Sequence, residues 1–144
     1  MSSVKIIFWT GTGNTAAMAE AVAQGVKEAG AEAELISVDK VNVAELVQDN
    51  AFALGCPSMG AEQLEEGEME PFMCELDGQI SGKKVGLFGS YGWGNQEWMR
   101  DWEDRVAKDG ATVVNGEGIA TKDYPDDEAL ANCVALGKAL AASL

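Results

Sequence analysis

The chain has 144 residues, of which 47% are hydrophobic and 24% are charged, and its formal net charge is −14 at neutral pH. This length fits one domain over residues 1–144, and the balanced composition excludes an intrinsically disordered chain. The absence of histidine excludes Ser-His-Asp and Cys-His catalytic groups and histidine metal sites, and the acidity argues against nucleic acid or an anionic membrane as a partner.

Predicted strands and helices alternate along the chain. Residues 4–9 form an apolar, partly β-branched run that indicates a buried strand, and residues 14–29 carry apolar side chains at helical spacing before a glycine. Further strands are expected at residues 35–38, 51–55, 83–94 and 112–119, and further helices at residues 68–76, 97–107 and 126–140. This alternation predicts an α/β fold, with a doubly wound five-stranded parallel sheet of order 2-1-3-4-5 and helices on both faces.

The loop after the first strand has the composition of an anion-binding turn. Its sequence, TGTGNT (residues 10–15, the TGTGNT loop), combines hydroxyl and amide side chains with two glycines, and a helix begins directly after it. Glycines let backbone N–H groups approach an anion, and a helix N-terminus adds unpaired N–H groups and a positive dipole end. We therefore expect this loop to hold a phosphate group without any cationic side chain.

Other phosphate-binding motifs fit less well. A P-loop requires a Gly-Lys pair, which the sequence lacks, and a receiver domain would need acidic residues where Trp9 and Cys56 stand. The dinucleotide fingerprint is closer, because Gly11-x-Gly13-x-x-Ala16 follows a strand and Asp39 falls near the end of the second strand. A dinucleotide-binding module therefore stays open as an alternative at this point.

Two further loops lie at the same predicted edge of the sheet, after the third and fourth strands. They read CPSMGAE (residues 56–62) and SYGWG (residues 90–94). Trp93 stands between two glycines and can stack on a planar ligand, and Met59 is a polarizable side chain suited to the opposite face of such a ring. Together with the TGTGNT loop, they predict a site for a flat, phosphorylated ligand.

The motifs TGTGNT, GCPSMGAE and GKKVGLFGSYGWG resemble the three signatures of short-chain flavodoxins, and the similarity runs through nearly the whole chain. An uninterrupted fifth strand over residues 112–119 fits the short-chain class. The resemblance implies a low-potential one-electron carrier that uses non-covalently bound FMN and cycles mainly between semiquinone and hydroquinone. It implies a protein that is not an enzyme, although a small FMN-dependent reductase is a second alternative.

The resemblance also implies the residues that contact FMN. They are Thr10, Gly11, Thr12, Gly13, Asn14, Thr15, Pro57, Ser58, Met59, Gly60, Ala61, Glu62, Ser90, Tyr91, Gly92, Trp93 and Gly94. By this likeness the TGTGNT loop holds the phosphate, Ser90 and Gly92 lie near the ribityl chain, and Trp93 and Met59 cover the two ring faces. Glu62 would accept a hydrogen bond from the flavin N3–H, and the Gly60 carbonyl would turn toward N5–H on reduction.

Acidic residues are concentrated in the middle of the chain. No basic residue occurs between Lys40 and Lys83, an interval with nine carboxylates. This run predicts a negative field that disfavours a more negative ring and that attracts basic docking surfaces. The family resemblance implies ferredoxin-type reductases and oxidoreductases as partners, and we expect a monomer.

Cysteine usage and the first residues bear on localisation. Cys56, Cys74 and Cys133 form no CxxC pair, and their odd number suits reduced thiols. The start MSSVKIIFWT lacks the features of a signal peptide, and no apolar run reaches the length of a membrane span. We therefore expect a cytoplasmic protein.

Overall fold

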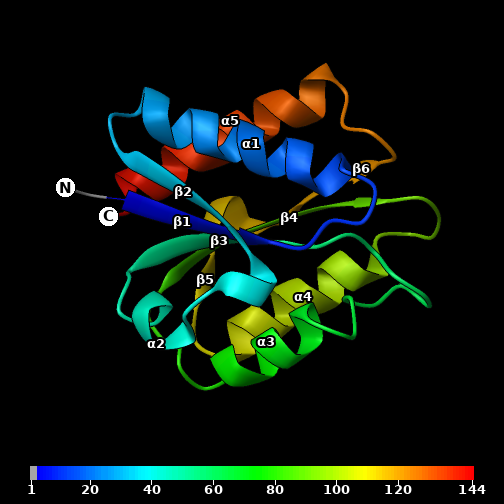
Figure 1. The fold of residues 1–144 in the computed structure, drawn as a ribbon, viewed down its shortest axis with the longest axis horizontal. Coiled ribbons are helices and arrows are strands. Elements are labelled where there is room, and N and C mark those ends of the chain that lie inside the picture. The colour runs from blue at the N-terminus through cyan, green and yellow to red at the C-terminus, as the bar shows by residue number, and fades with distance from the viewer. Residues whose placement is uncertain (1–2) are drawn as a thin grey trace.

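A parallel sheet forms the centre of the structure, a computed structural model that describes residues 3–144 (Figure 1). Its strands are β1 (Ser3–Phe8), β2 (Glu32–Ser37), β3 (Ala51–Gly55), β4 (Lys84–Tyr91), β5 (Thr112–Val113) and β6 (Ile119–Lys122). Their order is β2-β1-β3-β4-β5, and β6 also pairs with β4. These pairings are all parallel, so the predicted doubly wound order is confirmed.

Helices cover both faces of this sheet. Helices α1 (Asn14–Glu28) and α5 (Asp127–Ala142) pack together on one face, and α3 (Met69–Leu76) and α4 (Glu97–Lys108) lie on the other (Figure 1). Each face has its own buried apolar cluster. All five residues of β3 are buried, which explains its continuous apolar sequence at the centre of the sheet.

The second strand is longer than the sequence indicated. The prediction placed it at residues 35–38, whereas β2 begins at Glu32 and ends at Ser37, and Val38 starts a 3-10 helix η1 (Val38–Lys40). β2 is an edge strand, and its exposed glutamates interrupt the apolar run that indicates a strand in the sequence. A short helix α2 (Val43–Leu46), which the sequence analysis did not predict, follows with its N-terminus capped by the Asn42 side chain.

The prediction of an uninterrupted fifth strand over residues 112–119 is wrong. Only Thr112 and Val113 form β5, a 3-10 turn η2 (Val114–Gly116) interrupts the chain, and β6 resumes at Ile119. Asn115 and Gly116 both have positive φ, at 65° and 85°, which no strand accommodates. The break is a short turn, and it lets β6 continue along β4 as far as the pair Tyr91–Lys122.

The two tryptophans of α4, one helical turn apart, pack into the core. Trp98 and Trp102 are each 1% exposed and belong to the cluster beneath α3 and α4. The Trp98 indole N–H also donates to the Cys56 carbonyl at 3.0 Å, which fixes the start of the loop after β3. Within residues 3–144, no helix combines the length and the apolar character needed to cross a membrane.

Candidate functional site

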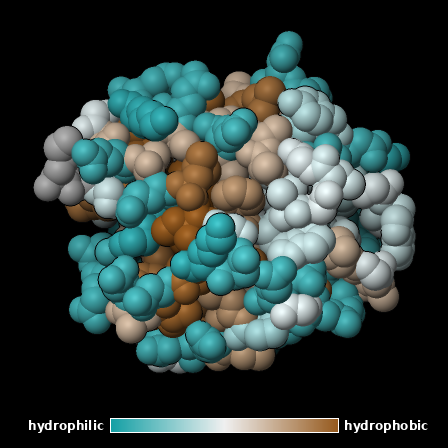
Figure 2. Space-filling model, in the orientation of Figure 1, coloured by the Kyte–Doolittle hydropathy of each residue, from teal (hydrophilic) through white to brown (hydrophobic). Residues whose placement is uncertain are grey.

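A cavity of about 280 Å³ opens at the carboxyl ends of the strands, where the loops after β1, β3, β4 and β6 meet. It is lined by Trp9, Gly11, Thr12, Asn14, Pro57, Ser58, Met59, Ser90, Tyr91, Gly92 and Asp123. Figure 2 shows pale residues of near-neutral hydropathy gathered on the right of the molecule, the side on which β1 ends in Figure 1. The three loops predicted from the sequence therefore do converge, and we call this space the strand-end cavity.

The TGTGNT loop presents the start of helix α1 to this cavity. Gly13 precedes the helix with φ 93°, a left-handed conformation that favours glycine, and its N–H donates to Thr10 Oγ1 at 3.1 Å. Among the described residues, no side chain caps α1, and none of its first-turn residues is acidic. The N–H groups of that turn and the positive end of the helix dipole are therefore available to an anion.

Thr15 carries an unsatisfied polar atom in the first turn of the same helix. The residue is 1% exposed, and its Oγ1 is buried without a hydrogen-bond partner among residues 3–144. Buried hydroxyl groups are nearly always paired, because an unpaired one costs free energy. A ligand acceptor in the loop would satisfy this hydroxyl.

The loop after β3 is a tight turn closed by two backbone hydrogen bonds. Met59 N donates to Gln63 O at 2.8 Å, and Gln63 N donates to Met59 O at 2.9 Å. Between them, Gly60 and Glu62 both have positive φ, at 51° and 52°. The glycine adopts this conformation without steric cost, whereas the glutamate requires compensating contacts.

Those contacts come from the start of helix α4. Glu62 Oε1 accepts hydrogen bonds from the N–H groups of Asn95, at 3.1 Å, and Glu97, at 2.9 Å. Gly94 lies so close that a Cβ there would collide with the Glu62 carboxylate. The Glu62 side chain thus joins the loop after β3 to the loop after β4, and its carboxylate keeps acceptor capacity for a further N–H donor.

The loop after β4 combines a buried hydroxyl with an exposed aromatic side chain. Ser90 is 4% exposed, and its hydroxyl donates to the Asp123 carbonyl at 2.8 Å. Met59, which lines the cavity, is 36% exposed, and Trp93, which follows the lining residue Gly92 but does not line the cavity itself, is 63% exposed. Large hydrophobic side chains of this kind are suited to cover a planar ligand.

Cys56, beside the strand-end cavity, is not poised for thiol chemistry. It is fully buried, and burial raises the pKa of its thiol to about 12. Its Sγ accepts from Glu65 N and donates to Pro57 O, both at 3.4 Å. Its thiol is therefore inert at neutral pH, because the thiolate is the reactive form.

Nine of the predicted contact residues line the strand-end cavity: Gly11, Thr12, Asn14, Pro57, Ser58, Met59, Ser90, Tyr91 and Gly92. Of the others, Glu62 lines a separate cavity with Trp98 and Arg105. The sequence analysis missed two lining residues, Trp9 and Asp123. Trp9 directly precedes the TGTGNT loop, and Asp123 directly follows β6, so both obey the strand-end rule.

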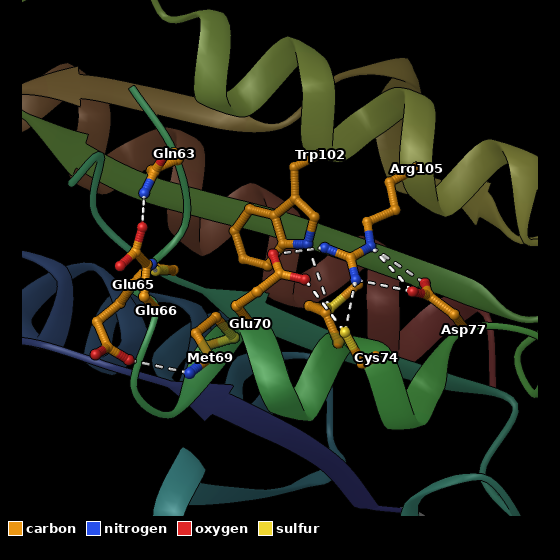
Figure 3. Close-up of polar contacts among 11 residues, drawn as sticks. Gln63, Glu65, Glu66, Met69, Glu70, Cys74, Asp77, Trp102 and Arg105 are labelled. Atoms are coloured by element: carbon orange, nitrogen blue, oxygen red, sulfur yellow. Dashed lines mark hydrogen bonds and ion pairs between the residues drawn. The ribbon is translucent and has the colours of Figure 1, made fainter. Parts of the chain in front are cut away.

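The acidic run is partly neutralised by cations from elsewhere in the chain. Arg105, on α4, forms ion pairs of 2.8 Å with both Glu70 and Asp77 (Figure 3). Hydrogen bonds from this guanidinium hold the pKa values of both carboxyls below their usual range. Lys5 pairs with Asp49 at 2.7 Å. Three of the nine carboxylates are therefore compensated, and the negative field is weaker than the sequence count indicated.

The strand-end cavity fits a flavin mononucleotide in its donor chemistry. The buried Thr15 hydroxyl, unsatisfied among residues 3–144, and the uncapped start of α1 suit a phosphate, and the exposed side chains of Met59 and Trp93 suit a flat ring. Among residues 3–144, no lysine, arginine or histidine lines this cavity. The residues present therefore match an anion held by neutral groups beside an aromatic system.

Comparison with known proteins decides the family. A family model described as Flavodoxin matches residues 6–137. The chain belongs to the flavodoxin family. It is 48% identical over 138 residues to the flavodoxin of Clostridium beijerinckii, covering 96% of this chain and 99% of that relative. It is 46% identical over 138 residues to the flavodoxin of Megasphaera elsdenii, with 96% and 98% covered.

A solved structure supports the same assignment. The solution structure of two-electron reduced Megasphaera elsdenii flavodoxin is similar at a TM-score of 0.87 and 45% sequence identity, covering 96% of this chain and 98% of that one. Members of the flavodoxin family bind FMN and are electron-transfer proteins, not enzymes. The assignment confirms the resemblance and favours the electron carrier over the FMN-dependent reductase and the dinucleotide-binding module.

Proposed function

We propose that the strand-end cavity holds FMN non-covalently and that the chain works as a low-potential one-electron carrier. The observation that carries this proposal is the buried Thr15 hydroxyl, unsatisfied among residues 3–144, at the uncapped start of α1. A phosphate there would accept from this hydroxyl and from backbone N–H groups. When bound, FMN supplies the one-electron chemistry.

The three loops divide the remaining contacts. In this proposal, Trp93 and Met59 would cover the two faces of the ring, and their exposed side chains support this role. Glu62 directs its remaining acceptor capacity to the flavin N3–H while it stays bonded to the start of α4. Gly60 would give its carbonyl the backbone freedom to turn toward the bound ring, because glycine adopts positive and negative φ with similar ease.

The surroundings of the strand-end cavity set the potential. Neutral groups bind the phosphate, and Asp123 adds a carboxylate to the cavity wall. Negative charge near a bound ring would disfavour its second electron, and the acidic surroundings together would lower that potential by on the order of 100 mV. Desolvation of the ring by Trp93 and Met59 acts in the same direction.

The partners in this proposal are redox proteins with basic docking surfaces, such as ferredoxin-type reductases and oxidoreductases. Trp93 and Tyr124 are 63% and 65% exposed, and each adjoins in sequence a residue that lines the cavity, so exposed aromatic side chains are available for docking beside it. Such surfaces suit transient, salt-sensitive encounters. We place the chain in the cytoplasm as a monomer, with residues 1–144 acting as one domain.

The test starts from apoprotein that has been reconstituted with FMN. The holoprotein is reduced and mixed in a stopped-flow instrument with an oxidised basic haem protein, and the transfer rate is measured over a range of salt concentrations. We expect one electron per encounter and a rate that falls steeply as salt screens the acidic surface.

An acidic acceptor protein of similar potential is the matched control. Its reaction should be slower at low salt and should accelerate as salt is added, because screening relieves repulsion. Failure of the apoprotein to take up FMN would overturn the cofactor site. Equal, salt-independent rates with the two acceptors would overturn the proposed docking surface.

A further inference from the structure

Trp9 lies between the sheet and the TGTGNT loop. It directly follows β1, and its backbone N–H donates to the Gly55 carbonyl at 3.0 Å, which extends the pairing with β3. Its half-buried side chain packs against the apolar cluster beneath α3 and α4. The Trp9 backbone is therefore held by the sheet, and its side chain is held by the apolar cluster on the α3–α4 face.

The indole ring of Trp9 contacts the loop itself. A Cβ built on Gly11 would lie 3.1 Å from the ring carbon Cη2 and 3.3 Å from Cζ3. Gly11 does not have positive φ, whereas Gly13 does, at 93°. Glycine is thus suited to the two positions for different reasons. Gly13 permits the left-handed turn before α1, and Gly11 lets the backbone lie against the Trp9 ring.

A hydrogen bond fixes the orientation of that ring. The Trp9 indole N–H donates to Glu68 Oε1 at 3.3 Å. Glu68 is the residue before α3, and its carbonyl accepts from Phe72 N at 3.1 Å. Trp9 therefore connects the TGTGNT loop to the start of the helix on the opposite face from α1, and it lines the strand-end cavity next to Gly11 and Thr12.

We infer that Trp9 is a positioning residue for phosphate binding: its ring supports the Gly11 backbone and holds the TGTGNT loop in its anion-binding shape. A loop that is already ordered loses less conformational entropy when its ligand binds. The affinity for a flavin that carries a phosphate thus depends on Trp9, whereas the affinity for a flavin without one does not. This inference rests on the proposed FMN site.

The experiment compares FMN with riboflavin, which lacks the phosphate. Apoprotein of the wild type and of Trp9→Leu is titrated with each flavin, and binding is followed by the quenching of flavin fluorescence. We expect Trp9→Leu to weaken FMN about tenfold and riboflavin less than about twofold. Gly11→Ala should produce the same selective loss, because its Cβ displaces the ring without removing it.

Two further variants sharpen the comparison. Trp9→Phe lacks both the indole N–H that bonds Glu68 and the distal ring atoms Cη2 and Cζ3 that face Gly11, so it should weaken FMN selectively, as Trp9→Leu does. Trp93→Leu removes an aromatic side chain whose proposed contact is with the flavin ring and not with the phosphate, so FMN and riboflavin should weaken together. Circular dichroism of each apoprotein establishes that it is folded.

The ratio of the two affinities decides the outcome. If wild-type apoprotein binds FMN but Trp9→Leu and Gly11→Ala leave the FMN-to-riboflavin ratio unchanged, this inference is overturned and the proposed function stands. If wild-type apoprotein binds neither flavin, the proposed function itself fails. Should Trp9→Leu not fold, Gly11→Ala and Trp9→Phe carry the same comparison.

Discussion

The α3–α4 side of the sheet and the strand-end cavity handle charge in opposite ways. Between α3 and α4, the carboxylates of Glu70 and Asp77 are neutralised by one guanidinium, that of Arg105 (Figure 3). Around the strand-end cavity, the groups suited to an anion are hydroxyls and backbone N–H groups, and no cation lines the cavity within residues 3–144. In the first region, a cation stabilises the structure by neutralising carboxylates. In the second, neutral dipoles are the groups available to an anion, so they do not compensate the negative charge around a ligand.

Removing the cation from the first region is expected to have the largest effect. Arg105→Leu would leave Glu70 and Asp77 facing each other on the α3–α4 side without a counter-ion. Because the Arg105 side chain is only 25% exposed, we expect the free energy of unfolding to fall by about 2 kcal/mol. Urea denaturation of the apoprotein measures this change, and FMN affinity should stay within about twofold.

Arg100→Leu is the matched control on the same helix. Arg100 is 41% exposed and pairs with Glu103 and Glu117 at 3.4 and 3.2 Å. Its loss should lower the free energy of unfolding by less than about 1 kcal/mol. Equal losses in the two variants would mean that the partly buried ion pairs of Arg105 stabilise the fold no more than the more exposed ion pairs of Arg100.

Thr15→Val tests the neutral groups of the second region. Valine has the shape of threonine and removes the hydroxyl that lacks a partner among the described residues. We expect FMN to bind about tenfold more weakly, while the apoprotein is as stable as the wild type or more so. FMN titration and thermal unfolding of the apoprotein measure the two effects. A destabilised apoprotein with unchanged FMN affinity would assign the hydroxyl to structure instead.

Asp109, near Asp77, gives the α3–α4 side a pH dependence. Burial and the neighbouring carboxylate raise the pKa of Asp109 to about 6. The folded protein therefore binds this proton more tightly than the unfolded chain, in which the pKa of an aspartate is about 3.9. Stability from this group is complete at low pH and is lost as pH rises toward 6.

Asp109→Asn should remove this contribution. We expect the difference in the free energy of unfolding between variant and wild type to grow from pH 4 to pH 6 and then to level off, in favour of the variant. After allowance for solvent screening, the difference is about 1 kcal/mol at pH 7. Urea denaturation of both apoproteins across this pH range measures it, and parallel curves would contradict the shift.

The smallest expected effect comes from Glu65, where backbone dipoles hold a carboxylate. Its Oε1 accepts from Glu68 N and Met69 N, and its Oε2 accepts from Gly67 N, at 2.7 to 3.0 Å. Partial desolvation raises the pKa of Glu65, but these hydrogen bonds outweigh it and lower the pKa overall. Backbone N–H groups of this kind are also available to an anion at the strand-end cavity, whereas here they hold a carboxylate of the protein itself.

Glu65→Gln should lower the free energy of unfolding by about 0.5–1 kcal/mol at pH 7. Because the folded pKa is depressed, the wild-type advantage is present above the unfolded pKa and should shrink as pH falls below about 4. Denaturation of both apoproteins at pH 7 and at about pH 3 measures it. A difference that grows toward acid would have the wrong sign for this interaction.

Local sequence patterns predicted most of the fold and the position of the site. β1 is a mainly apolar run and β3 a continuous one. The rule that ligands bind at the carboxyl ends of the strands located three of the loops that form the cavity. The rule missed Asp123 because the fifth strand was expected to end at residue 119, whereas the turn at Asn115 and Gly116 restarts it as β6. Once β6 is known, the same rule places Asp123 in the cavity wall.

Contacts between distant segments could not be predicted in this way. The acidic run contains no basic residue, yet Arg105 reaches Glu70 and Asp77 from another helix, 35 and 28 positions away. Likewise, the hydrogen bond from Trp9 to Glu68 spans 59 positions. Such pairs depend on how α3 and α4 pack on the sheet, which no local pattern in the sequence specifies.

A redox titration of the FMN holoprotein tests the central claim most directly, namely that a cavity lined by no cationic residue among residues 3–144 makes its ligand resist further negative charge. Spectroelectrochemistry at low and high salt would resolve the one-electron steps. The account predicts two separate steps, with the second lowered relative to free FMN by on the order of 100 mV and shifted upward by salt. A single two-electron step at the potential of free FMN, indifferent to salt, would contradict it.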